Sequence, residues 1–123
     1  MISGGSTPSI DVITTIAGTG SSSYSGDNGQ ATSANIYYPH GIDIDSSGNV
    51  YFSDWGDNRV RKITAATGII TTYAGTGVNS FSGDGGVASS AAVYGPNGLC
   101  LDSSGNNFTR NSIPLTHSTT YFV

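Results

Sequence analysis

Two aspartates lie in nearly identical loops whose residue types could hold a metal ion or a phosphate. Asp27 lies in SGDNGQATSA, residues 25–34, and Asp84 lies in SGDGGVASSA, residues 82–91. An EF-hand would need a later Glu, and the sequence contains none. A phosphate loop would need Gly-Lys-Ser/Thr, and no Lys is near either loop. The pattern favours a structural role, in which each aspartate bonds its own loop backbone, and we expect no metal and no cofactor.

Both loops belong to a longer internal repeat. Residues 13–49 align without gaps on residues 70–106, and 23 of the 37 positions are identical, which sets a period of 57 residues. A repeat of this length indicates one supersecondary unit that stacks on its neighbours.

Alternating apolar residues predict short strands joined by turns. We expect an outer strand over 10–17, a full four-stranded antiparallel unit over 39–74 and the next inner strand over 96–102. A sheet of this kind with apolar residues on both faces must stack against another, so the fold class is all-β, an incomplete β-propeller of about two blades. The residues expected to have turn or repeat roles are Asp27, Asp84, Gly41, Asp45, Gly48, Asn49, Asp54, Asn58, Gly98 and Asp102.

Several motifs recur in the order found in one known family. The sequence reads PHGIDID at 39–45, GNVY at 48–51 and NRVRKI at 58–63, and an AGTG…SGD insert lies at 17–34 and again at 74–91. These stretches resemble the NHL repeat family, in its subfamily with long repeats, which implies blades of a six-bladed type of propeller. The stretch YFSDW at 51–55 also looks like the YWTD blades of lipoprotein-receptor propellers, which share the architecture.

The resemblance implies a non-catalytic scaffold that binds a protein or a small ligand through a propeller face. The alternative is a fragment of a six-bladed propeller enzyme, similar to calcium-dependent lactonases or an amidating lyase, that is inactive alone. We assign no catalytic residue, because nothing places Ser, His and Asp as a triad. The possible contact residues at the rim are His40, Trp55, Arg59 and Asn97. Trp55 is the best single anchor if it is exposed.

The composition of the chain limits the classes of partner that it could bind. The chain has 123 residues, 36% of them hydrophobic, and 18 glycines, so any core is thin. Its net charge is −4, and the only basic cluster is Arg59, Arg61 and Lys62, which we expect to form a solvated strand face. That balance argues against nucleic acid. No apolar run is long enough for a membrane span, the N-terminus does not read as a signal peptide, and the single Cys100 cannot form an internal disulfide.

The repeat stops abruptly after Asn106. Residues 107–120 share no identity with residues 50–63, their equivalents in the period. We expect 107–123 to be an atypical tail produced by a shifted reading frame, a mis-called splice site or a truncated gene model; the rival hypothesis is a genuine, unusual C-terminus. We expect residues 1–9 to be disordered. Two repeats cannot close a propeller, so incomplete blades are also expected to self-associate.

Overall fold

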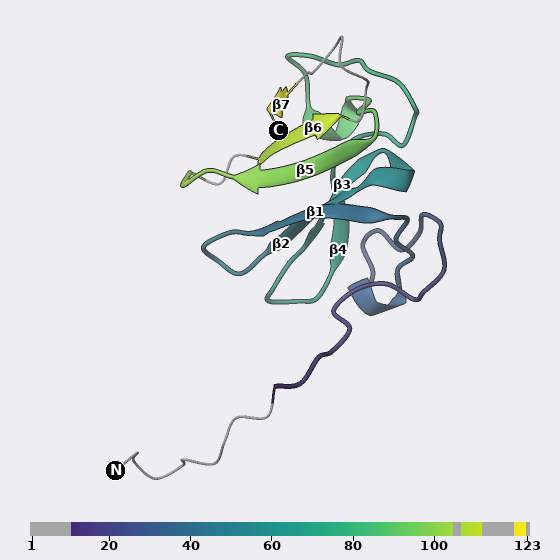
Figure 1. The fold of residues 1–123 in the computed structure, drawn as a ribbon, viewed down its shortest axis with the longest axis vertical. Helices are drawn as coiled ribbons and strands as arrows, with labels where there is room; N and C mark the ends of the chain where they lie inside the picture. Colours follow the sequence, from purple (N-terminus) through teal and green to yellow (C-terminus); the bar gives the residue numbers. More distant parts are fainter. Residues whose placement is uncertain (1–10, 105–106, 112–119, 123) are drawn as a thin grey trace.

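The first repeat forms one four-stranded antiparallel sheet. The structure is a computed structural model, and it describes residues 11–104, 107–111 and 120–122. The strands are β1 (Pro39–Ile44), β2 (Val50–Asp54), β3 (Arg59–Ile63) and β4 (Ile70–Ala74), paired in that order. Figure 1 shows this sheet lying beside a second one. The expected all-β fold built from four-stranded antiparallel blades is confirmed.

The second sheet repeats the start of the first. It consists of β5 (Pro96–Leu101), β6 (Asn107–Asn111) and β7 (Thr120–Phe122). Pro96 pairs with Asn111 as Pro39 pairs with Asp54, and the register is irregular directly after each of these pairs. The backbone of β6 therefore occupies the position of β2, although its sequence does not follow the repeat.

The expected outer strand over 10–17 is wrong for the part that the structure describes. Residues 11–17 form no strand, whereas the equivalent stretch of the second copy is β4, which pairs with β3. A strand needs a hydrogen-bonded neighbour, and no described strand lies beside 11–17 to supply one. Residues 1–10, which include the N-terminus expected to be disordered, and residues 105–106 lie outside the described residues, as do the tail residues 112–119 and 123.

The core of the first sheet lies on one face, under the long connection that precedes β1. Phe52, Ile63 and Ile70 are buried there together with Ala31 and Ala34. Ala31 is the first residue of the short 3-10 helix η1 (Ala31–Ser33), and Ala34 directly follows it. The connection is tied to the sheet because the Asn28 N–H donates to the Ile70 carbonyl at 2.7 Å. An equivalent helix, η3 (Ala88–Ser90), lies in the second copy.

The inner strands β1 and β5 lie side by side and join the two sheets (Figure 1). A Cβ built on Gly41 would lie 2.5 Å from the Leu99 nitrogen, so only glycine permits this approach. The buried Ser53 hydroxyl accepts a 2.7 Å bond from the Gly41 N–H and donates to the Asn97 carbonyl. The Leu101 N–H donates to the Asp43 carboxylate at 2.9 Å.

The opposite side of β1 is open. Ile42 and Ile44 are 60% and 58% exposed. Ile42, Ile36 and Val50 help to line an apolar groove of about 280 Å³ next to the start of β1. Within the described part of the chain, no helix is long and apolar enough to cross a membrane.

Candidate functional site

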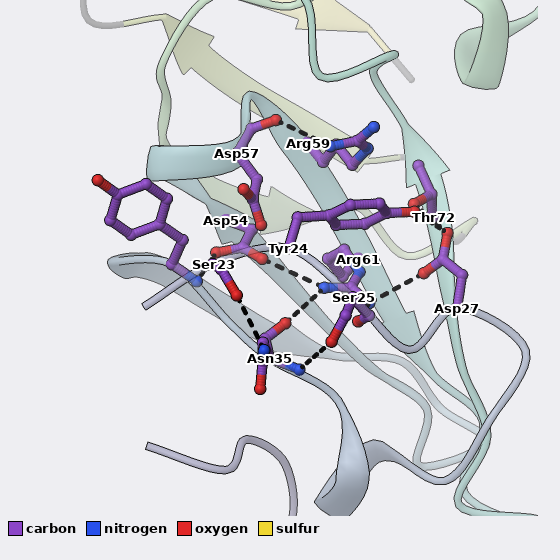
Figure 2. Close-up of polar contacts among 11 residues, drawn as sticks. Ser23, Tyr24, Ser25, Asp27, Asn35, Asp54, Asp57, Arg59, Arg61 and Thr72 are labelled. Carbon is purple, nitrogen blue, oxygen red and sulfur yellow. Dashed lines mark hydrogen bonds and ion pairs between the residues drawn. The ribbon is translucent and has the colours of Figure 1, made fainter. Parts of the chain in front are cut away.

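Arg61 is the centre of a buried polar network rather than part of a solvated face. Its side chain is fully buried. Nη1 donates to the Asn35 carbonyl at 3.2 Å and to Asp54 at 3.3 Å, and Nη2 donates to the Ser25 carbonyl at 3.1 Å. The expected solvated face is therefore wrong at Arg61, because the connection at 18–38 covers the side of β3 on which this side chain lies. Figure 2 shows the guanidinium among these partners.

Asp27 closes this network from the connection. Its carboxylate accepts bonds from Arg61 at 2.9 Å, from the Tyr24 hydroxyl at 2.7 Å and from the Thr72 hydroxyl at 2.5 Å. Burial alone would raise the pKa of Asp27, but Thr72, Tyr24 and Arg61 stabilise the carboxylate, so its pKa lies below the usual value. Two of these bonds tie the carboxylate to β3 and β4 (Figure 2), rather than to the loop's own backbone as the sequence suggested.

The second copy of the loop has no matching arginine. Position 118, one period after Arg61, is Ser, and it lies outside the described residues. Asp84 is exposed. In the first copy the SGD motif clamps the connection onto β3 and β4.

Asp54 ends β2 on the other side of Arg61. It is fully buried and accepts a 2.8 Å bond from the Tyr37 N–H. Burial raises the pKa of Asp54 to about 7, and the nearby Asp57 carboxyl adds to the rise against the opposing effects of Tyr37 and Arg61. Asp57 is itself buried, and burial raises its pKa too. Two neighbouring buried carboxyls next to a single arginine explain why the upward direction prevails.

The remaining repeat residues lie at turns and at the joint between the sheets. Asp45 accepts bonds from the Ser47 and Asn49 N–H groups at 2.9 Å, and Gly48 has the positive φ of +84° that this turn requires. Asp102 accepts from the Ser104 N–H in the equivalent turn. Asn58, at φ +52°, accepts a bond from the Gly95 N–H and so links the two repeats.

The possible contact residues divide into two groups. His40 and Asn97 lie together, with His40 Nδ1 3.0 Å from Asn97 Oδ1, and His40 stacks on Trp55 at a centroid distance of 5.7 Å. Arg59 lies elsewhere: its guanidinium stacks on Tyr24 at 3.7 Å and donates to the Thr76 carbonyl at 2.8 Å. Thus three of the four residues gather where β1 and β5 begin and β2 ends.

Tyr38 completes this cluster, although its type and position in the sequence did not single it out. Its ring meets Trp55 edge-on at 6.4 Å, and it is 57% exposed, while Trp55 is 38% exposed. Tyr38 has φ +55°, a left-handed conformation that costs a non-glycine residue roughly 1 kcal/mol. Its equivalent in the second copy is Gly95 at φ +48°. That Tyr/Gly difference was the available signal. We call Tyr38, His40, Trp55 and Asn97 the aromatic rim.

No group of three His, Cys, Asp or Glu side chains among the described residues is placed to hold a metal ion. Cys100 is exposed and has the sheet position of Asp43 in the repeat. The arrangement offers a contact surface of rings and planar polar groups on a rigid sheet.

The two sheets, their glycine-mediated approach and the repeated turns define a protein built from NHL-type β-propeller blades. A sequence model described as the teneurin NHL domain matches residues 14–82. The chain belongs to this family, which confirms the resemblance to NHL repeats. A comparison with curated proteins found no match.

Solved structures share the architecture. A structural-genomics protein of unknown function from Bacteroides thetaiotaomicron is 27% identical with a TM-score of 0.58, and the match covers 65% of this chain and 20% of that one. A protein described as a putative phosphatase from the same organism is 25% identical with a TM-score of 0.57, and the match covers 76% of this chain and 23% of that one. The chain thus spans about a fifth of the length of these structures.

Proposed function

We propose that the chain is a non-catalytic propeller scaffold that binds a protein or a small ligand through the aromatic rim. The observation that carries this proposal is the difference between the two repeats at equivalent positions. Gly41, which permits the close approach of the two sheets, recurs as Gly98, whereas Tyr38 and His40 are replaced by Gly95 and Asn97.

Tyr38 supports the proposal through its conformation. A tyrosine is held, largely exposed, where glycine is the unstrained choice and where the second repeat has glycine. Backbone strain of this kind is found more often at sites that bind than at sites that only pack. Exposed Tyr and Trp are also the residues most enriched at contact hot spots.

The test compares the chain with a variant whose rim carries the residues of the second copy. Tyr38→Gly, His40→Asn and Trp55→Ser together introduce the residues found at positions 95, 97 and 112. Both proteins are applied to peptide and glycan arrays after thermal melts have established that both are folded. We expect ligands of the natural chain to be lost by the variant. Identical binding patterns, or no ligand for the natural chain, would overturn the proposal.

A further inference from the structure

We propose that the corner between Tyr38 and Trp55 binds the arginine side chain of a basic peptide segment, an inference that rests on the scaffold function proposed above. The two rings lie at 66° to one another rather than stacked, with their centroids 6.4 Å apart. Tyr38 is 57% exposed and Trp55 is 38% exposed, so part of each ring at this corner is accessible to a partner. A guanidinium or ammonium group is attracted to the face of an aromatic ring, most strongly to Trp.

Three of the chain's own cations already make this interaction. Arg59 and Arg61 lie over the Tyr24 ring at 3.7 and 5.0 Å, and Lys62 lies over Tyr51 at 5.6 Å. These three residues are most of a total of four Lys and Arg. Among the side chains that the structure describes, no cation lies over the Tyr38 ring. The Tyr37 ring packs against it at a centroid distance of 4.9 Å, and Tyr38 is still 57% exposed, so a cation from a partner can reach it.

The charge of the chain favours a basic partner. Its net charge is −4 and its pI is about 4.5. Long-range attraction speeds the encounter with a positively charged segment and disfavours an acidic one. The chain has only four Lys and Arg residues, so it offers few positive charges to an acidic partner.

The polar groups of the rim fit a peptide better than a sugar. His40 Nδ1 and Asn97 Oδ1 bond to one another at 3.0 Å, so they are partly engaged and offer fewer partners to a ring of hydroxyls. His40 also stacks on Trp55 with the planes at 26°, which supports the indole from one side. The rim therefore presents supported rings rather than an array of free donors and acceptors.

Trp55 is the only tryptophan in the chain, so its fluorescence reports directly on the rim. The probe is the acetylated, amidated peptide Gly-Arg-Gly-Arg-Gly, and the matched control peptide carries Gln in place of Arg. We expect the arginine peptide to change the emission saturably and the Gln peptide to bind at least about fivefold more weakly. We expect added salt to weaken the arginine peptide further.

The variant Tyr38→Gly keeps the reporter and has the residue that the second repeat carries at this position. We expect it to melt at the same temperature or higher, since its strain is relieved, and to bind the arginine peptide at least about fivefold more weakly. Val87→Ala, which shortens an exposed side chain outside the rim, should leave the affinity unchanged.

The outcomes separate this inference from the scaffold proposal. Equal response to the Gln peptide, or a Tyr38-dependent response to the neutral sugar maltotriose alone, would overturn the cation site and leave a binding rim. Arginine-peptide binding that Tyr38→Gly does not weaken would overturn the assignment to this corner. If no probe changes the Trp55 emission, the inference fails, and the array comparison alone decides the scaffold function.

Discussion

Arg61 Nη2 lies 2.9 Å from Asp27 Oδ1, and this ion pair fastens the long connection of the repeat to the middle of its own sheet. The arginine is fully buried and the aspartate side chain is only 23% exposed. Two further carbonyls of the connection, at Ser25 and Asn35, also accept bonds from Arg61. The SGD motif looks like a ligand loop, but its polar groups at Ser25 and Asp27 bond to Arg61 inside the blade.

Removing the arginine should be costly because it leaves buried acceptors without a partner. We expect Arg61→Met to destabilise the fold by about 3–5 kcal/mol in urea unfolding. Lys62→Met is the matched control, because the Lys62 side chain lies over Tyr51 on the other side of the strand. This change should cost less than about 1 kcal/mol. Asp27→Asn combined with Arg61→Met should show a coupling of about 1–3 kcal/mol. Additive effects would mean that the ion pair contributes nothing.

The pH dependence of stability should reveal Asp54. The unfolded chain loses the Asp54 proton near pH 3.8, whereas the folded chain holds it up to about pH 7. The folded state binds more protons between these values, so the free energy of unfolding should fall as the pH rises from about 4 to 7. The raised pKa of Asp57 acts in the same direction. Denaturant melts at several pH values measure this slope.

Two variants test which aspartate causes the fall in the free energy of unfolding between pH 4 and 7. Asp54→Asn should flatten the fall between pH 4 and 7 while keeping an oxygen for the Tyr37 N–H. Asp27→Asn should leave that fall in place, because the lowered pKa of Asp27 gives stability that is lost only as the pH drops below about 3.8. A chain whose stability rises from pH 4 to 7 would show that Asp54 is ionised throughout in the folded state.

The joint between the blades depends on one glycine of an equivalent pair. A Cβ on Gly41 would meet the Leu99 nitrogen at 2.5 Å and the Asn97 oxygen at 2.7 Å, whereas a Cβ on Gly98 would meet nothing within 4 Å. We expect Gly41→Ala to destabilise the fold by about 1–3 kcal/mol and Gly98→Ala to change it by less than about 1 kcal/mol. Equal effects in thermal unfolding would contradict the close approach of β1 and β5.

Local sequence patterns predicted the strands of the blade. Contacts between residues far apart in the sequence determined the features that these patterns did not predict. The strands from Pro39 to Ala74 follow from apolar alternation and from turn residues such as Asp45 and Gly48, which act on near neighbours. The burial of Arg61 depends on Asp27, 34 positions away, and no local pattern contains that contact. A strand also needs a neighbour, which is why 11–17 did not form one.

The candidate site was only partly visible for the same reason. His40, Trp55 and Asn97 were singled out by type and position, but the sequence did not show that the first two stack or that the third lies beside them. Tyr38 was hidden because its left-handed backbone is a property of the turn into β1. Comparison of the repeats, which pairs Tyr38 with Gly95, shows the difference without revealing the strain.

Two paired residues on the core face of the first sheet should respond differently to mutation. Phe52 is 5% exposed in the core, whereas its β1 partner Ile42 is 60% exposed beside the apolar groove. We expect Phe52→Ala to cost about 3–5 kcal/mol, and Ile42→Ala to cost less than about 1 kcal/mol in a dilute monomer. Urea unfolding at low and high protein concentration measures both changes. A cost at Ile42 that grows with protein concentration would show that another copy covers this face, whereas a large cost at every concentration would contradict its exposure.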